Sequence, residues 1–225
     1  MNNIKEEKFL AAKEAVKHVE TGQVVGLGTG STAYFAIAEI GEMIKSGLRI
    51  KAIPTSSQTE DQARSLGIEL VSVDDVDAID LTIDGTDEFD DNLNLIKGGG
   101  GALLKEKMVA RITKKQVIIA DSSKKVDVLG VFMIPVEVLP FTVNYVQRRI
   151  SELGGAGNIR MKEGKHFLTD EENYIIDADF GEIEDPYDIS DKLNNIEGVV
   201  CNGLFLDLAD VVIMGTEDGI VTFEK

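Results

Sequence analysis

Short apolar segments alternate with amphipathic segments through the first 125 residues of this 225-residue chain. The apolar segments have the length of strands, and the segments between them repeat apolar residues with helical spacing. Strands that alternate with helices form a mostly parallel sheet with helices on both faces. We therefore predict an α/β fold built on a doubly wound, mostly parallel, Rossmann-like sheet. The predicted strands are residues 24–27, 50–57, 68–73, 78–83 and 116–120, and the predicted helices are residues 4–19, 32–45, 58–66 and a segment around Glu106.

The pattern changes after Ile134, where strands and helices follow in the order β-α-β-β-α-β. This order resembles a ferredoxin-like unit, and the last two strands, ADVVIMG and IVTFEK, are predicted to return to the first sheet as a hairpin. We therefore predict two domains. Residues 1–129 plus 207–225 form a Rossmann-like domain with the candidate site residues, and residues 130–206 form a smaller α+β domain that serves as a lid or in oligomerisation.

The chain is acidic, with 23 Lys and Arg against 40 Asp and Glu and a net charge of -17. This balance argues against nucleic acid and anionic membrane as partners, so an anionic ligand must be held by local positive charge. No apolar run reaches the length of a membrane span, and the N-terminal residues do not form a signal peptide. A single cysteine, Cys201, excludes a disulfide framework and fits a cytoplasmic location. The two histidines lie far from it, so no metal site is expected.

The turn after the first predicted strand reads GLGTGST. It lacks the third glycine of a dinucleotide fingerprint and the acidic residue after the second strand, and no lysine precedes Ser31 as in a Walker loop. For this turn alone two interpretations stay open: a phosphate-sized anion site, and a plain turn in which Ser31 or Thr32 caps the helix. Polar residues end four predicted strands at one edge of the sheet, which favours the anion site. The candidate binding residues are Thr29, Gly30, Ser31 and Thr32.

The fourth predicted strand delivers the sequence DGTD at its C-terminal end. It is interpretable as a solvated acidic turn, as a metal site, or as carboxylates that accept hydrogen bonds from hydroxyl groups and transfer protons. The calcium-loop template fails because its glycine and glutamate are absent from the required positions. We favour the third interpretation, with Asp84, Gly85, Thr86 and Asp87 as candidates.

A lysine followed by four glycines opens the next helix, which carries Glu106. Four glycines are costly to order, and a glycine run at a helix N-terminus offers N–H groups and a positive dipole to an anion. Lys97 is expected to stabilise an oxyanion or the aspartates, and Glu106 is a candidate base. A surface lysine and a helix glutamate favoured by the dipole are the alternatives. Lys105 and Lys107 are expected to point outward.

Five segments resemble type A ribose-5-phosphate isomerase in their order and spacing: GLGTGST, DGTDE, KGGGGALLKEK, DSSKKVD and PVEV. The resemblance covers essentially the whole chain, including GTEDGI near the C-terminus. Two positions depart from the family pattern, since Thr86 stands where alanine is common and Phe141-Thr142 replaces a smaller pair. Neither departure changes a charged residue.

The resemblance implies a metal-independent aldose–ketose isomerase without a cofactor, which interconverts ribose 5-phosphate and ribulose 5-phosphate in the non-oxidative pentose phosphate pathway. It implies that Glu106 is the base of a cis-enediolate mechanism and that Asp84 and Asp87 bind hydroxyls and assist ring opening. It also implies a homodimer or homotetramer. The implied substrate contacts are Thr29 to Thr32, Asp84 to Asp87, Lys97, Gly98, Gly99, Gly100 and Lys124.

Two alternatives belong to other functional classes. A non-catalytic sensor module that binds a sugar phosphate would keep the anion sites without needing a base at Glu106. A metal-dependent phosphatase would use the aspartates and would lose its activity in the presence of a chelator.

Overall fold

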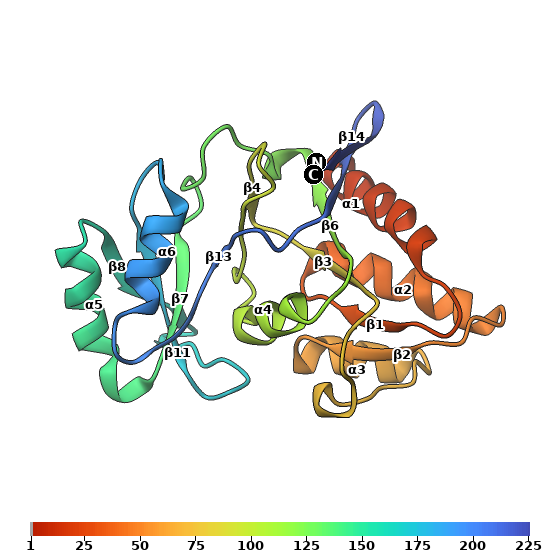
Figure 1. Ribbon diagram of the computed structural model, residues 1–225, viewed down its shortest axis with the longest axis horizontal. Coiled ribbons are helices and arrows are strands. Elements are labelled where there is room, and N and C mark those ends of the chain that lie inside the picture. Colours follow the sequence, from red (N-terminus) through yellow and green to blue (C-terminus); the bar gives the residue numbers. More distant parts are fainter. Residues whose placement is uncertain (1) are drawn as a thin grey trace. The chain divides into compact units, whose positions relative to one another are not determined.

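The computed structural model describes residues 2–225 and divides into two compact units (Figure 1). The first unit holds the chain up to Thr86 together with Lys105–Lys125 and Asp207–Lys225. The second unit holds Asp87–Leu104 and Val126–Leu206. Residues 87–104 and 126–129, which the sequence grouped with the Rossmann-like domain, thus belong to the second compact unit. The role of residues 130–206 as a lid stays a prediction.

A six-stranded sheet in the order β15-β14-β6-β3-β1-β2 forms the centre of the first unit. All neighbours from β2 to β14 are parallel, and β15 is antiparallel to β14. The predicted mostly parallel α/β sheet is confirmed, as is the return of the C-terminal hairpin to it. The strands are β1 (Val24–Leu27), β2 (Lys51–Pro54), β3 (Leu81–Gly85), β6 (Gln116–Asp121), β14 (Val211–Thr216) and β15 (Gly219–Glu224).

Helices cover both faces of this sheet. On one face, Ala12 of α1 and Ile37 of α2 join a core that includes Ala52 of β2. Ile53, the next residue of β2, packs instead with Val109 of α4. Because successive strand residues point to opposite faces, α4 lies on the other side of the sheet. The helices are α1 (Asn2–Ala15), α2 (Ser31–Lys45), α3 (Ser57–Ser65) and α4 (Leu103–Arg111), with 3-10 turns η1 (Val16–His18), η2 (Val73–Asp75) and η3 (Ser122–Lys124).

The predicted strand over residues 68–73 was wrong except for one bridge. Leu70 pairs with Ala52, and the chain then turns into η2. The side chains of Ser72 and Asp75 cap this turn reciprocally, which ends the pairing with β2.

An ionic contact ties together the N-terminal ends of interior strands of the same sheet. Asp80 accepts hydrogen bonds from the Val24 N–H at 2.9 Å and from the Lys114 ammonium at 2.8 Å. The hydrogen bond from Lys114, followed by that from Val24, lowers the pKa of the Asp80 carboxyl below its ordinary value. The ionised carboxylate therefore holds the first residue of β1 beside the loop before β3.

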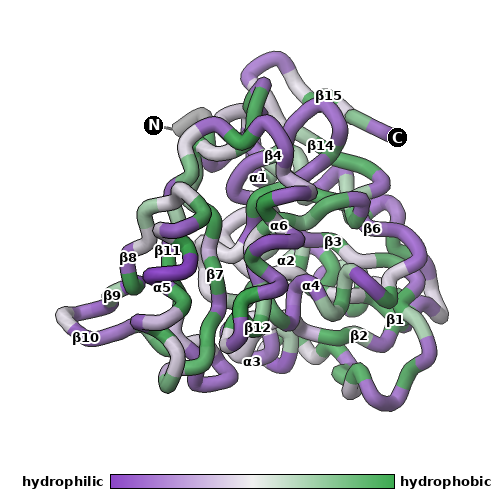
Figure 2. The backbone as a smooth tube through the Cα atoms, turned by 60° about the vertical axis from the view of Figure 1, so that its left-hand side comes forward, coloured by the Kyte–Doolittle hydropathy of each residue, from purple (hydrophilic) through white to green (hydrophobic). Residues whose placement is uncertain are grey.

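The second unit contains an antiparallel sheet in the order β12-β7-β11-β8, with α5 and α6 between its strands in the chain. The β-α-β-β-α-β order and this strand order confirm the predicted ferredoxin-like arrangement. A hydrophilic hairpin, β9 and β10, extends from it (Figure 2), and β13, β5 and β4 form a small third sheet. The elements are β4 (Glu88–Phe89), β5 (Leu95–Ile96), β7 (Ile134–Val138), η4 (Pro140–Thr142), α5 (Val143–Glu152), β8 (Ala156–Ile159), β9 (Met161–Lys162), β10 (Lys165–His166), β11 (Tyr174–Asp179), α6 (Pro186–Asn194), β12 (Val199–Asn202) and β13 (Leu204–Phe205).

Side chains of β7 and α5 build the core of this second unit. Ile134, Val136 and Val138 of β7 pack with Val146 and Ile150 of α5 in one apolar cluster.

No helix of residues 2–225 combines the length and apolar character needed to cross a membrane.

Candidate functional site

The predicted site residues are divided between the two compact units. In the first unit lie Thr29 to Thr32, Asp84 to Thr86, Glu106 and Lys124. In the second unit lie Asp87 and the segment from Lys97 to Gly100.

The turn between β1 and α2 is built around a buried carboxylate. Asp84, fully buried at the end of β3, accepts hydrogen bonds from the Thr29 N–H at 3.0 Å and the Gly85 N–H at 2.7 Å. A Cβ atom at Gly28 would lie 2.0 Å from Asp84 Oδ1, so only glycine fits there. The structure thus brings the predicted residues at the ends of β1 and β3 into direct contact.

Hydroxyl groups join the end of β2 to the same turn. Thr29 Oγ1 lies 2.8 Å from Thr55 Oγ1 and 2.8 Å from Ser56 Oγ, and the Thr59 hydroxyl donates to the Gly28 carbonyl at 2.9 Å. Ser56 also caps α3 by accepting from the Thr59 N–H, whereas the capping-box spacing of Ser57 and Glu60 in the sequence predicts the cap one residue later. The Thr29 hydroxyl is therefore held by hydrogen bonds to the hydroxyl groups that follow β2.

Helix α2 begins without a side-chain cap. Its N-cap is Gly30, with φ 110°, so neither Ser31 nor Thr32 caps it as one interpretation had it. A glycine cap leaves the first N–H groups of the helix without the side-chain acceptor that serine or threonine supplies. Helix N-termini with such N–H groups are suited to anions.

A lysine that sequence reasoning missed lies beside this N-terminus. Lys8 of α1 donates to Ser31 Oγ at 3.0 Å, and its Nζ lies 3.7 Å from Asp121 Oδ2 at the end of β6. Lys8 lies next to the turn because α1 packs on the sheet. Its sequence context is that of an ordinary surface lysine, so no local pattern points to it. A cavity of about 620 Å³ opens here, lined by Ile4, Lys5, Lys8, Gly30, Ser31, Tyr34, Phe35 and Gln58.

The end of β6 is tied to α1 by a second missed residue. Buried Glu7 accepts hydrogen bonds from the Ser122 N–H at 2.9 Å and the Ser122 hydroxyl at 2.7 Å. Asp121 accepts from the Ser123 N–H at 3.1 Å, and the predicted contact residue Lys124 closes the η3 turn. Helix α1 therefore holds the turn after β6 through Glu7.

The glycine run in the second unit is sterically required. Gly98 and Gly101 have φ values of 100° and 86°, which side chains rarely adopt. The Gly99 N–H donates to Asp87 Oδ2 at 2.7 Å, and a Cβ atom at Gly99 would lie 2.6 Å from Asp87 Oδ1. Asp87 and the glycines are thus in contact, and the Gly99 N–H is committed to the carboxylate.

The alternative of a surface lysine at Lys97 does not hold, whereas the position of Glu106 fits a helix glutamate favoured by the dipole as well as a base. The Lys97 side chain is 2% exposed, and its Nζ lies 5.3 Å from the centroid of the Phe205 ring, a cation–π distance. Glu106, in the first turn of α4, is 4% exposed. The expectation that Lys107 points outward was wrong, because it is 9% exposed.

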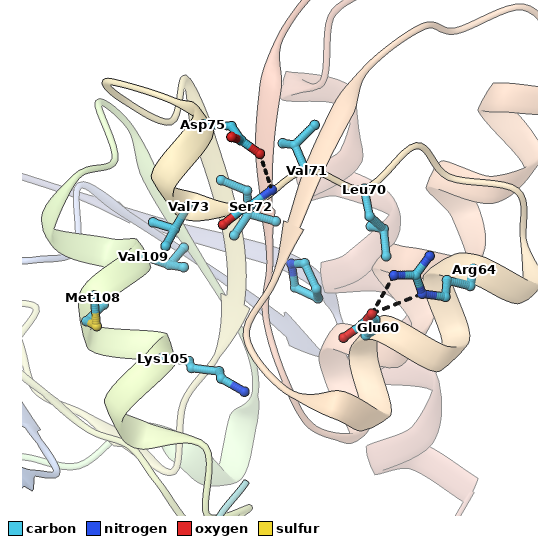
Figure 3. Close-up of a pocket in the computed structure, with 12 residues that line it drawn as sticks. Glu60, Arg64, Leu70, Val71, Ser72, Val73, Asp75, Lys105, Met108 and Val109 are labelled. Atoms are coloured by element: carbon cyan, nitrogen blue, oxygen red, sulfur yellow. Dashed lines mark hydrogen bonds and ion pairs between the residues drawn. The ribbon is translucent and has the colours of Figure 1, made fainter. Parts of the chain in front are cut away.

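A separate cavity of about 480 Å³ lies between α4 on one side and α3 with the end of β2 on the other (Figure 3). The Lys105 side chain points toward it, and the Glu60–Arg64 ion pair of α3 lies across from it. None of the predicted site residues lines this cavity. Its lining is Ile53, Pro54, Glu60, Arg64, Leu70, Val71, Ser72, Val73, Asp75, Lys105, Met108 and Val109.

Within residues 2–225, no three His, Cys, Asp or Glu side chains are grouped so that they could hold a metal ion.

Comparison with known proteins places this α/β chain among the aldose–ketose isomerases. The model of the family described as Ribose 5-phosphate isomerase A (phosphoriboisomerase A) matches residues 51–219. The Streptococcus gordonii ribose-5-phosphate isomerase A is 48% identical over 225 residues, covering 100% of this chain and 99% of the relative. The chain belongs to the ribose 5-phosphate isomerase A family.

Solved structures agree with this assignment. Ribose 5-phosphate isomerase A from Methanocaldococcus jannaschii has a TM-score of 0.93 and 43% identity, covering 97% of this chain and 98% of that one. A D-ribose-5-phosphate isomerase in complex with phospho-erythronic acid has a TM-score of 0.96 and 42% identity, covering 99% of this chain and 100% of that one. The alternative of a non-catalytic sensor module is not supported by these comparisons.

Proposed function

We propose that the chain catalyses the reversible isomerisation of D-ribose 5-phosphate and D-ribulose 5-phosphate, a step of the non-oxidative pentose phosphate pathway. The observation that carries the proposal is a buried glutamate, Glu106, five positions after the last glycine of the run, in a chain that matches the isomerase family along its length. The relative solved with phospho-erythronic acid supports a phosphorylated sugar as the ligand, since that compound is a phosphorylated four-carbon sugar acid.

The substrate phosphate is assigned to the N-terminus of α2. Gly30 leaves the first N–H groups of this helix to an anion, and Lys8 supplies a cation beside Ser31 at 3.0 Å. Lys124, at the end of η3, is the second cation proposed to contact the substrate. In a chain of net charge -17, these local positive charges must attract the phosphate.

Asp84 is proposed to assist opening of the furanose ring. As the ring opens, the anomeric hydroxyl loses its proton, the bond from the anomeric carbon to the ring oxygen breaks, and that oxygen gains a proton. A buried carboxylate that already accepts two backbone N–H bonds is fixed in orientation, which suits a proton acceptor. Asp87 is proposed to bind a sugar hydroxyl.

Glu106 is proposed as the base that moves the proton between adjacent carbons. It removes the proton from carbon 2 of the open aldose, and the electron pair forms the carbon–carbon double bond of a cis-enediolate as the carbonyl oxygen becomes negative. The hydroxyl proton on oxygen 2 passes to oxygen 1, and Glu106 returns its proton to carbon 1, which leaves a carbonyl at carbon 2 and a hydroxyl at carbon 1. A single carboxylate serves both transfers because the two carbons present the same face to it.

Lys97 and the glycine run are proposed to stabilise the enediolate. The Lys97 ammonium is almost completely buried, and electrostatic stabilisation is stronger in a site from which water is excluded. Gly98, Gly99 and Gly100 would bring the backbone close to the reacting end of the sugar. No cofactor or metal is assigned a role in this mechanism.

Three further features remain proposals. A homodimer or homotetramer would be tested by light scattering of the purified protein. A cytoplasmic location rests on the single cysteine and on the expected pathway. The smaller domain as a lid would be tested by comparing hydrogen exchange with and without substrate.

The proposed function is tested by incubating the protein with ribose 5-phosphate, with and without a chelator, and by measuring ribulose 5-phosphate and inorganic phosphate. The proposal predicts equal isomerisation in both samples and no phosphate release. Phosphate release that the chelator abolishes would show that the protein is a metal-dependent phosphatase instead. Substrate binding without conversion would show that it is a non-catalytic sensor module.

A further inference from the structure

Arg160, which lies outside the predicted site, donates hydrogen bonds to the backbone of the glycine run. Arg160, directly after β8, donates from Nη1 to the Gly98 carbonyl at 2.9 Å and to the Gly99 carbonyl at 3.1 Å. Its other side forms a two-pronged ion pair with Asp177 of β11, through Nε to Oδ2 at 3.0 Å and through Nη2 to Oδ1. One guanidinium therefore connects the sheet of the second unit to two consecutive carbonyls of the loop.

These contacts orient two peptide planes. The described residues contain no cis peptide bond, and in a trans peptide the N–H points opposite to the C=O. Arg160 holds the Gly98 carbonyl, so the Gly99 N–H points away from it, toward Asp87 Oδ2 at 2.7 Å. By the same geometry, the hydrogen bond from Arg160 to the Gly99 carbonyl directs the Gly100 N–H to the side opposite Arg160.

The surroundings of Arg160 keep the guanidinium in place. Its side chain is 14% exposed and that of Asp177 is 19% exposed, so the pair is largely shielded from water. The Arg160 Cζ lies 5.8 Å from the centroid of the Phe167 ring, within range of a cation–π contact. The Phe167 ring also fills the space where a Cβ atom of Gly101 would lie, at 2.5 Å. The loop is thus held at three of its four glycines.

We infer that Arg160, held by Asp177, is a positioning residue that fixes the peptide planes of Gly98 to Gly100 for the reacting end of the substrate. The inference rests on the proposed function, in which these glycines bind that end of the sugar. Arg160 itself is not assigned a contact with substrate. Its effect is to make the Gly100 N–H a preorganised donor, which needs no reorientation as charge develops.

Arginine suits this role better than lysine. The guanidinium presents five donors in a rigid plane, and here one edge engages a carboxylate while Nη1 reaches two carbonyls. An ammonium is a compact charge without a planar fork, so lysine cannot reproduce both sets of contacts. Arg160→Lys therefore keeps the positive charge but cannot form the hydrogen bonds to Asp177 and to both glycine carbonyls at once.

The test compares Arg160→Lys and Asp177→Asn with Arg149→Lys, a matched control on the same unit. Arg149 pairs with Glu152 on the exposed surface of α5, where such pairs contribute little. We expect kcat to fall about 10- to 100-fold in the two test variants, as for a displacement of about 1 Å in a site, with KM nearly unchanged. Inhibition by phospho-erythronic acid should weaken by a similar factor, whereas inhibition by inorganic phosphate should stay as in the wild type.

Two kinetic results would overturn the inference. One is a wild-type kcat in Arg160→Lys, and the other is an equal loss of affinity for phospho-erythronic acid and inorganic phosphate, which indicates general disruption. Hydrogen exchange of residues 97–101, measured by mass spectrometry, tests the hydrogen bonds from Arg160 to the loop without relying on catalysis. Exchange should be faster in the test variants than in the control. If the wild type does not isomerise, the proposed function fails, while unchanged exchange would refute the role of Arg160 separately.

Discussion

Replacing Gly28 with alanine tests the packing that holds Asp84. The new Cβ atom would lie 2.0 Å from Asp84 Oδ1, 2.4 Å from its Cγ and 2.5 Å from its Cα. Moving the side chain alone cannot relieve a contact with a backbone atom. The Gly28 N–H also donates to the Ile83 carbonyl at 2.9 Å, which ties the turn to β3.

The expected loss of stability has two parts. Overpacking a buried position costs about 1–3 kcal/mol. Displacing Asp84 from the Thr29 or Gly85 N–H removes a hydrogen bond to a charged group, which contributes about 1.5–3 kcal/mol. We expect Gly28→Ala to lower the free energy of unfolding by about 2.5–6 kcal/mol in total, and to lower kcat about 100-fold because Asp84 is misplaced.

The assay combines urea unfolding with steady-state isomerisation of ribose 5-phosphate. Gly47→Ala is the control, since Gly47 has φ 110°, no atom other than those of its chain neighbours lies within 4 Å of the position that its new methyl group would take, and the residue is outside the site. That variant should lose only the cost of left-handed backbone, about 1–2 kcal/mol, and keep normal turnover. A Gly28→Ala protein as stable and as active as the control would refute the reasoning.

Two other predictions concern single charged groups. Lys8→Met should raise KM for ribose 5-phosphate about 10- to 100-fold with little change in kcat, because a charge-assisted bond to phosphate is lost; an unchanged KM in steady-state kinetics would remove Lys8 from the phosphate site. The lowered pKa of Asp80 stabilises the fold above the ordinary aspartate pKa, and this stabilisation is lost as pH falls through the folded-state pKa. Asp80→Asn should therefore flatten the acid limb of stability against pH in urea melts, and identical slopes for both proteins would contradict the assignment.

The main sheet was predictable because its parallel strands are buried on both faces and read as short apolar runs between helices. The segment at residues 68–73 misled the prediction because it lies beyond β2 at the edge of the sheet, where one bridge at Leu70 is its only pairing. The folded chain also decided the helix caps, since Gly30 and Ser56 cap α2 and α3 in place of the neighbouring residues that sequence rules allow.

Most of the candidate site could be proposed from local motifs, because glycines and carboxylates at strand ends have strong local signatures. The supporting residues could not. Glu7 meets Ser122 across 115 positions of sequence, and Arg160 meets Gly98 across 62. A glutamate or lysine on an amphipathic helix and an arginine after a short strand have no pattern that sets them apart until the chain is folded.

The most direct test of the account is transfer of solvent deuterium by wild type and Glu106→Gln. In heavy water, the wild type should place deuterium on carbon 1 of ribulose 5-phosphate. The Glu106→Gln variant should bind phospho-erythronic acid but lose turnover and exchange at least about 10²- to 10⁴-fold, the range for proton-transfer catalysis. Near-normal exchange in that variant would contradict the role of Glu106 as the base.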